Sequence, residues 1–333
     1  MLEALKFIDD VSLNMGGGSS LVLNLSIAFI MFGVALELDL REFVTLFKSP
    51  KPVFVGIFSQ FLLMPALTFG LVIIFRNHIT LTVGLGMILV AACPGGNLSN
   101  FFSNLARGNL ALSVSLTAFS GLGGFVLTSL NFVFWGNLYL DFYTSTANVV
   151  AIPHLEIPFW IVMQTIFIMM GIPMVLGVLF RHRFPKITLR IVVTIKRISI
   201  LFFFTILGIL FSRNLDNLFN YIFYVFILVF IHNLIALAAG YGIARMSGLK
   251  KKDRKTISIE TGIQNTSVAI VLLLNPEIFP ADMAKGGLMF MAVGYGVWHF
   301  LSGLIIAGIW SGFSLKPRTG IIEAKSGGQL TTI

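Results

Sequence analysis

The sequence predicts an all-α polytopic membrane protein with about nine transmembrane helices. Of its 333 residues, 56% are hydrophobic and only 11% are charged, whereas an average soluble domain is about 25% charged. Apolar segments of about 20 residues, the length that crosses a bilayer as a helix, recur along the chain. Lys and Arg gather in alternate connections between these segments, as expected when the connections lie on opposite sides of a membrane.

Four apolar segments account for the first part of the chain. The first follows a Gly/Ser-rich linker at residues 16–20, and the second follows the basic residues Lys48 and Lys51. Arg107 separates the third from the fourth. These spans are expected at residues 20–38, 53–75, 79–105 and 110–135.

Five further segments fill the rest of the chain. A basic run beginning at Arg181 follows the fifth span, and another beginning at Arg245 follows the seventh. The ninth ends before Lys316. These spans are expected at residues 157–180, 192–212, 218–244, 255–275 and 284–311.

The charged residues also predict the orientation. With the N-terminus outside, nineteen of the 23 Lys and Arg residues fall on the cytoplasmic side. The outside keeps Lys6, Arg76, Arg213 and Lys285. By the positive-inside rule the chain is a multi-pass protein of the cell inner (cytoplasmic) membrane, with its N-terminus outside and its C-terminus in the cytoplasm. The net charge of +9 follows from this topology, and no segment is long enough to form a basic face for nucleic acid.

This orientation divides the chain into three parts. Residues 1–19 are expected to form an N-terminal extracytoplasmic segment, and residues 313–333 a cytoplasmic tail. Between them, residues 20–312 form a single membrane domain made of two halves, 20–135 and 157–312.

Two spans are interrupted near the middle of their apolar runs. Span three contains Cys93-Pro94-Gly95-Gly96-Asn97-Leu98-Ser99-Asn100, and span eight contains Glu260-Thr261-Gly262-Ile263-Gln264-Asn265. Proline removes a helical hydrogen bond, and glycine weakens a helix. A carboxylate at membrane depth costs about 2.5–3.5 kcal/mol on insertion scales. Such breaks are tolerated where they are buried in protein or line a wet cavity, so both indicate a functional site.

The two interrupted spans are expected to run antiparallel. Span three crosses from outside to inside and span eight from inside to outside, as inverted repeats require. The broken helix is the third of four spans in the first half and the fourth of five in the second. Compared with a five-plus-five plan, the sequence is therefore expected to lack one N-terminal helix.

Oxygen donors surround the two breaks. C-terminal carbonyls of half-helices suit cations, and helix N-termini suit anions. Hard oxygen ligands with one carboxylate favour Na⁺ or a proton over zinc or copper. The donors are Ser99, Asn100, Ser113, Thr117, Glu260, Thr261, Gln264 and, in span two, Gln60.

Each of these residues also has a structural interpretation. Glu260 could pair with Lys255 or Arg254 near the inner interface. Ser113 and Thr117 share one helix face and could bond to the preceding turn or join helices. Pro94 and Gly95 could form an ordinary kink. Gln60 could satisfy carbonyls freed near Pro65, and His299 could pack against Trp298.

At these residues the chain resembles the bile acid:sodium symporter family, from about residue 27 to 311. The resemblance rests on Cys93-Pro94-Gly95-Gly96-x-x-Ser99-Asn100, Leu105-Ala106-Arg107-Gly108-Asn109-x-Ala111-Leu112-Ser113-Val114-x-x-Thr117, Glu260-x-Gly262-x-Gln264-Asn265 and Val297-Trp298-His299. It implies an inverted repeat with a panel domain, a core domain and two crossing discontinuous helices. Members with nine helices lack the first helix of the ten-helix plan.

The resemblance also implies two sodium sites and a substrate site. The first sodium site would use Ser99, Asn100, Ser113, Thr117 and Glu260. The second would use the side chains of Gln60, Glu260 and Gln264 with the backbone carbonyls of Thr261 and Ile263. Two Na⁺ ions beside one shared carboxylate leave a positive site that favours an anionic substrate. Substrate would lie near Asn97, Asn265, Thr266 and His299.

The chain departs from the family pattern at two positions in this region. Asn97 stands where the family commonly has Thr, and Phe300 stands where bacterial relatives that bind bile acids have Asn. Both positions are where substrate selectivity would be set. Other bacterial relatives carry smaller carboxylates such as pantoate. The resemblance therefore implies either a bile acid-like steroid or a smaller carboxylate as the substrate.

The sequence thus predicts a sodium-coupled secondary active symporter that imports an organic anion by alternating access. The chain is not expected to be an enzyme. Its sequence contains no His-Glu-x-x-His motif and no two acidic residues at a depth in the membrane where they could form a catalytic pair. No obligate protein partner is evident; the lipid bilayer and a small organic anion are the expected partners. The main alternative is a proton-coupled carrier or uniporter on the same fold, with an intramembrane enzyme as a more distant one.

Overall fold

The computed structural model describes residues 5, 9, 19–36, 50–96, 98–146, 157–212, 215–280 and 283–313. Within these ranges the regular secondary structure is helical, and the single β-type contact is an isolated bridge. The helices are α2 (Ser19–Ala35), α4 (Pro50–Phe58), α5 (Met64–Phe75), α6 (Leu81–Ala92), α7 (Leu98–Leu105), α8 (Leu110–Thr146), α9 (Phe159–Ile166), α10 (Ile172–Arg183), α11 (Pro185–Ser212), α12 (Leu215–Met246), α13 (Lys251–Gly262), α14 (Thr266–Leu273) and α15 (Gly286–Ser311).

The all-α membrane fold is confirmed. Helices occupy every segment expected to span the membrane, and in the described ranges five are long and apolar enough to cross it. These five are Pro50–Phe75, Leu110–Ser145, Phe159–Arg183, Phe223–Met246 and Gly286–Ser311. The count of nine spans stays a prediction.

Two helix boundaries differ from those expected. α8 continues to Thr146 instead of ending near 135, and α11 begins at Pro185 instead of 192. Hydropathy marks only the part of a helix that matches the hydrocarbon layer. A helix continues past that layer because its backbone hydrogen bonds are satisfied internally in water as well as in lipid.

Two π-helical turns join pairs of α-helices into longer spans. The turn η1 (Ser59–Leu63) links α4 to α5, and η2 (Phe167–Gly171) links α9 to α10. Each is followed by a proline at the start of the next helix, Pro65 or Pro173. Proline cannot continue the regular hydrogen-bond pattern, and a π turn absorbs the mismatch. As a result Ser59 and Gln60 lie on a turn that departs from ordinary helical register.

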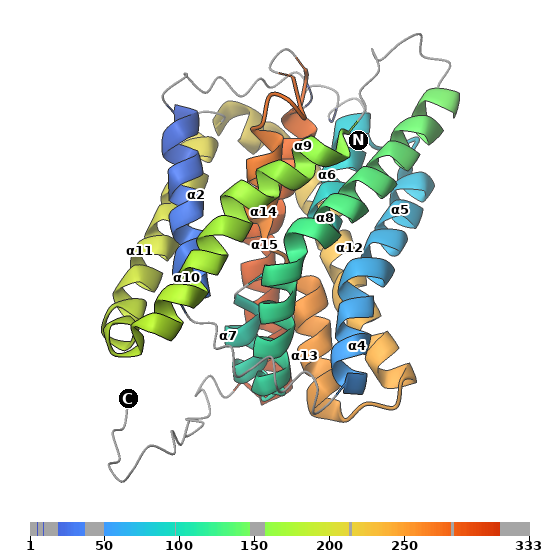
Figure 1. Cartoon of the computed structure of the whole chain (residues 1–333). Coiled ribbons are helices and arrows are strands. Elements are labelled where there is room, and N and C mark those ends of the chain that lie inside the picture. The colour runs from blue at the N-terminus through green and yellow to red at the C-terminus, as the bar shows by residue number, and fades with distance from the viewer. Residues whose placement is uncertain are drawn as a thin grey trace.

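The helices form two groups. α2 packs against α10 and α11, which also pack against each other, and Figure 1 shows these three together at the left of the molecule. The larger group contains α4 to α8 and α12 to α15, with α12 against α13 and α6 against α15 as its closest pairs. The groups meet where α9 packs against α8 and α14, and where α2 packs against α14.

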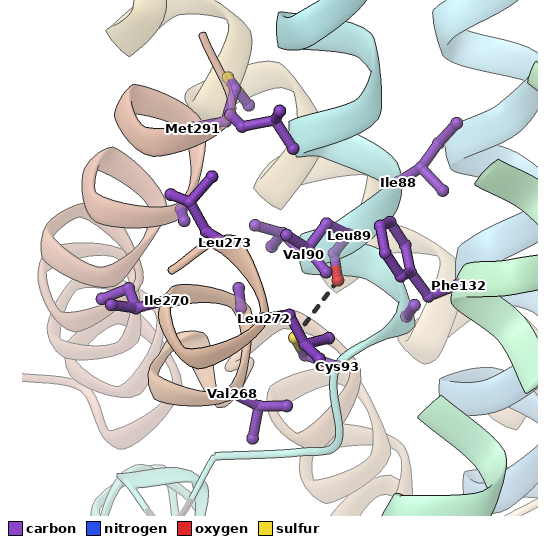
Figure 2. Close-up of a cluster of buried hydrophobic side chains, with 14 of the residues drawn as sticks. Ile88, Leu89, Val90, Cys93, Phe132, Val268, Ile270, Leu272, Leu273 and Met291 are labelled. Atoms are coloured by element: carbon purple, nitrogen blue, oxygen red, sulfur yellow. Dashed lines mark hydrogen bonds between the residues drawn. The ribbon is translucent and has the colours of Figure 1, made fainter. Parts of the chain in front are cut away.

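The apolar core surrounds the first broken helix. All twelve residues of α6 are buried, and Figure 2 shows Cys93 in one buried cluster with side chains of α6, α8, α14 and α15. The Cys93 thiol is fully buried and donates to the carbonyl of Leu89 at 3.3 Å. The end of this half-helix is therefore enclosed by protein, as its free backbone groups require.

The chain ends are described only in part. Asp9 of the expected extracytoplasmic segment accepts hydrogen bonds from Thr80 at 3.0 Å and from Thr82, at the start of α6. The rest of that segment, apart from Leu5 and Ser19, lies outside the described residues, as does the expected tail from residue 314 onward.

Candidate functional site: the crossing of two interrupted helices

Both interrupted spans break where the sequence predicts, and the two breaks cross. α6 ends at Ala92 and α7 begins at Leu98, while α13 ends at Gly262 and α14 begins at Thr266. Figure 1 shows α6 and α14 in the upper half of the molecule and α7 and α13 in the lower half. Each broken helix therefore has one half on either side of a common crossing point.

The two breaks pair with each other through their backbones. Gly95 and Gln264 form an antiparallel bridge. The N–H of Gly96 donates to the carbonyl of Ile263 at 2.7 Å, and the N–H of Asn265 donates to the carbonyl of Pro94 at 2.8 Å. Each break thus satisfies backbone groups that the other leaves free, which buried peptide groups require. This reciprocal pairing excludes an ordinary proline kink at Pro94.

Two glycines make this close approach possible. A Cβ on Gly95 would lie 2.6 Å from Oε1 of Glu260, and a Cβ on Gly96 would lie 2.9 Å from the carbonyl oxygen of Gln264. Both distances are shorter than side-chain carbons tolerate. Gly95 therefore leaves the space that the Glu260 carboxylate occupies.

Glu260 lies in a buried cluster of oxygen atoms built by α7, α8 and α13. Its side chain is 2% exposed. Thr117 donates to Oε1 at 3.0 Å, and Ser113 donates to Oε2 at 3.4 Å. The Thr117 hydroxyl is also 3.2 Å from Oδ1 of Asn100 and 3.3 Å from the hydroxyl of Ser99. The structure thus brings together all five residues expected at the first sodium site.

The first cluster is a set of oxygen atoms around one carboxylate. A threonine hydroxyl carries one proton, so Thr117 can donate to Asn100 or to Glu260 but not fully to both. The carboxylate, the amide oxygen and the hydroxyl oxygens form an electron-rich pocket. A small cation that prefers oxygen ligands fits this donor set.

Gln60, on the η1 turn, is the centre of a second polar cluster. Its Nε2 donates to the carbonyl of Cys93 at 2.9 Å and to Oε1 of Gln264 at 2.7 Å. Nε2 of Gln264 donates to the carbonyl of Thr261 at 2.8 Å. Because Gln60 bonds across to both breaks, its expected alternative role, satisfying carbonyls near Pro65, is wrong.

One atom of this second cluster lacks a partner. Oε1 of Gln60 is buried and has no hydrogen bond. A buried acceptor without a partner is unfavourable unless something else binds it. A buried amide oxygen in a cluster with backbone carbonyls suits a hard cation. The carbonyl of Ile263, also expected here, accepts from Gly96, and sharing of Glu260 between the two clusters stays a prediction.

The basic residues near Glu260 have other partners. Nζ of Lys255 donates to the carbonyls of Ala106 at 2.9 Å and Trp310 at 3.0 Å. Nε of Arg254 donates to the carbonyl of Leu249 at 2.6 Å. The alternative in which Glu260 is paired with either of them is therefore wrong.

Of the residues expected to contact substrate, Asn265 and Thr266 lie at the second break, and His299 lies one turn after Tyr295 in α15. Asn97 is outside the described residues. Nδ2 of Asn265 is 3.8 Å from the sulfur of Met31 in α2, so Asn265 lies where the two helix groups meet. The hydroxyl of Thr266 and Nδ1 of His299 are buried without hydrogen-bond partners. These free polar atoms are available to a ligand, but their role in substrate binding stays a prediction.

The residues next to His299 belong to apolar packing. Trp298 packs against Phe226 and Phe230, with ring centroids 4.6 and 5.5 Å away. His299 instead faces Tyr295, with ring centroids 6.0 Å apart. Phe300 packs against Phe102, with ring centroids 5.8 Å apart. This position is therefore part of an apolar cluster with α7.

Three further residues bond to the second break and were not singled out from sequence. Ser59 bonds to the hydroxyl of Thr261 at 2.8 Å. Nδ2 of Asn233 and the hydroxyl of Tyr295 donate to the carbonyl of Gly262 at 2.8 and 3.0 Å. A signal for Asn233 exists, since the pair His232-Asn233 interrupts an otherwise apolar run and polar groups at membrane depth are often functional.

The donor chemistry selects against transition metals. Among the described residues no group of three or more His, Cys, Asp or Glu side chains could hold a metal ion. Both clusters consist of hydroxyl, amide, carbonyl and carboxylate groups. The residues present therefore fit Na⁺.

Comparisons with known proteins agree with this chemistry. The model of the family described as "Sodium Bile acid symporter family" matches residues 24–221, more than half of the chain. A Bacillus subtilis protein named "Uncharacterized sodium-dependent transporter YocS" is 29% identical over 294 residues, covering 88% of this chain and 84% of the relative. A rice protein named "Probable sodium/metabolite cotransporter BASS2, chloroplastic" is 29% identical over 74% of this chain and 55% of its own length. The rabbit "Ileal sodium/bile acid cotransporter" is 24% identical over 84% of this chain and 79% of its own length.

Proposed function

Because this chain belongs to the sodium bile acid symporter family, we propose that it is a sodium-coupled secondary active symporter that imports an organic anion. The observation that carries this proposal is the buried carboxylate of Glu260, which accepts hydrogen bonds from two hydroxyls at the crossing of two broken helices. A charged group at that depth is costly unless it has a function. Binding a coupling cation is a function that fits its all-oxygen surroundings.

Two sodium ions are assigned to the two clusters. The first is held by Ser99, Asn100, Ser113, Thr117 and Glu260. The second is held by Gln60, Glu260 and Gln264 with the carbonyls of Thr261 and Ile263. The buried Oε1 of Gln60, which lacks a partner, supports the second site. Two monovalent cations beside one carboxylate leave a net positive charge, which attracts an anion.

The ends of the half-helices separate the two kinds of ligand. α6 and α13 end at the crossing, so their C-terminal carbonyls favour cations, whereas α7 and α14 begin there, so their N-terminal amides favour anions. The substrate is assigned to the second pair of ends, near Asn97, Asn265, Thr266 and His299. A bile acid-like steroid and a smaller carboxylate such as pantoate both provide the required anionic group.

The two helix groups supply the moving parts. α2, α10 and α11 would form the panel domain and the larger group the core domain, and the contact between Asn265 and Met31 lies where they meet. Sodium would order the crossing and so prepare the anion site. The coupling must be reciprocal, so the anion also raises the affinity for sodium.

The test is uptake into proteoliposomes containing the purified protein, with radiolabelled taurocholate and pantoate as probes. An inward Na⁺ gradient should drive accumulation of at least one probe, and an equal K⁺ gradient should not. Glu260→Gln should abolish this uptake because it removes the charge that holds the cations. Glu277→Gln, which changes an exposed carboxylate, is the matched control and should transport normally.

Two outcomes would contradict the proposal. Undiminished Na⁺-driven uptake in Glu260→Gln would exclude the assigned ion site. Uptake that follows a pH gradient and ignores Na⁺ would favour the proton-coupled carrier, since a single buried carboxylate can also carry a proton.

A further inference from the structure

The carbonyl of Gly262, the last residue of α13, is held by two side chains from outside the proposed ion sites. Nδ2 of Asn233 in α12 donates to it at 2.8 Å, and the hydroxyl of Tyr295 in α15 donates to it at 3.0 Å. The same Nδ2 is 3.1 Å from the Tyr295 hydroxyl. Asn233 is 1% exposed and Tyr295 is fully buried. Two helices thus direct buried donors at one backbone oxygen.

This carbonyl lies between the two that are assigned to the second sodium ion. The carbonyl of Thr261 accepts from Gln264, and that of Ile263 accepts from Gly96. The carbonyl of Gly262 is bonded instead toward α12 and α15. Three successive carbonyls therefore have three different sets of partners, and the middle one is held by α12 and α15.

The middle peptide needs this restraint because the helix has ended. The last carbonyls of a helix receive no intrahelical hydrogen bond. Glycine adds freedom, because it allows backbone conformations that other residues avoid. The N–H of the same peptide, on Ile263, still donates to the carbonyl of Ile259 at 2.8 Å, so the two side chains hold only the carbonyl end. Without them this end could tilt, and the tilt would shift the neighbouring carbonyls relative to the ion.

Tyr295 is itself held in place. Its ring lies 5.4 Å from the ring of His232 and 6.0 Å from that of His299. Nε2 of His232 is hydrogen-bonded to the hydroxyl of Thr68 at 2.8 Å. The ring is thus packed between two imidazoles, and its hydroxyl can be removed without removing that packing.

We propose that Asn233 and Tyr295 are positioning residues for the second sodium site. By holding the Gly262 carbonyl toward α12 and α15, they orient the Thr261 and Ile263 carbonyls toward the ion. This inference rests on the proposed function, since it concerns the coupling ion. It adds two residues from helices that contribute none of the assigned sodium ligands.

The test uses Na⁺ alone, so it does not depend on the identity of the substrate. Thermal unfolding of the purified full-length protein is measured against NaCl concentration, with choline chloride keeping the ionic strength constant. Na⁺ that binds the native state raises the melting temperature, and the concentration dependence reports its affinity. The variants are Tyr295→Phe and Asn233→Ala. Tyr139→Phe is the matched control, because it removes a buried tyrosine hydroxyl that has no hydrogen-bond partner.

Tyr295→Phe and Asn233→Ala should each raise the Na⁺ concentration for half-maximal stabilisation by about fivefold to tenfold, the equivalent of one hydrogen bond. The double variant should show less than the product of the two effects, because both residues act on one carbonyl. Tyr139→Phe should leave the Na⁺ dependence unchanged. If Asn233→Ala cannot be purified folded, Tyr295→Phe decides the matter, since it keeps the packed ring.

The failures of the inference and of the proposed function are distinguishable. A wild-type protein that Na⁺ does not stabilise more than choline would contradict both. If Na⁺ stabilises the wild type and Tyr295→Phe shows the same Na⁺ dependence, the inference is overturned but the proposed function is not. This holds even if the variant melts at a lower temperature. An equal shift in Tyr139→Phe would also overturn it, because the effect would then belong to any buried hydroxyl.

Discussion

Replacing Gly95 with alanine should weaken sodium binding without unfolding the protein. A Cβ at this position would lie 2.6 Å from Oε1 of Glu260, whereas ordinary contacts begin at 3.4 Å. The atom in the way is the end of a flexible side chain, so the carboxylate can move while the backbone crossing stays formed. The required displacement is about 0.8 Å, the difference between these two distances.

The size of the effect follows from the hydrogen bond that this displacement breaks. Thr117 donates to Oε1 at 3.0 Å, and a shift of that size away from the hydroxyl takes the pair beyond hydrogen-bond range. A hydrogen bond to a charged group contributes about 1.5–3 kcal/mol. The Na⁺ concentration that gives half-maximal uptake should therefore rise between about 10-fold and 150-fold.

The assay is the initial rate of probe uptake into proteoliposomes at a series of external Na⁺ concentrations. Gly70→Ala is the control, because a Cβ there meets nothing within 4 Å. A double variant that combines Gly95→Ala with Glu260→Asp should recover part of the affinity, since the shorter acid withdraws from the new methyl group. Unchanged Na⁺ dependence in Gly95→Ala would refute the placement of the carboxylate beside Gly95.

Two further substitutions test the second cluster and the contacts of Lys255, near the start of α13. Gln60→Leu removes the buried Oε1 that lacks a partner, so the Hill coefficient for Na⁺ in uptake should fall from about 2 toward about 1; an unchanged coefficient would exclude Gln60 as a ligand. Lys255→Met removes the ammonium that bonds to the carbonyls of Ala106 and Trp310, and should cost about 1–3 kcal/mol of stability. A lowered melting temperature with unchanged Na⁺ dependence is the expected result there, and a lost Na⁺ response would indicate a direct role in ion binding.

The positions of the two breaks could be predicted because their signals are local. Pro94 with its two following glycines, and Glu260 with its neighbouring amides, stand out within apolar runs. The structure ends α6 at Ala92 and α13 at Gly262, inside or beside the expected segments. The ends of α8 and α11 were less predictable, because hydropathy follows the membrane thickness and helices continue beyond it.

The partners of each polar residue were harder to predict, because they come from distant parts of the chain. Ser59 bonds to Thr261 across 202 positions, and Asn233 reaches Tyr295 across 62. No local pattern encodes such pairs. The alternative pairing of Glu260 with Lys255 was plausible from their spacing of five residues, but a buried lysine also finds partners among free carbonyls at helix ends.

The crossing provides a physical reason for coupling a cation to an anion at one place. Two helices end there and two begin there, and the backbones of the two breaks are bonded to each other through Gly96, Ile263, Pro94 and Asn265. A cation that orders the carbonyl ends must therefore also order the residues that lead into the amide ends of α7 and α14. Ion binding then orders these residues in advance, so the protein loses less conformational entropy when the anion binds. Because this coupling runs through shared backbone, a substitution that loosens the Gly262 carbonyl should weaken the dependence of anion uptake on Na⁺ as well as the affinity for Na⁺ itself.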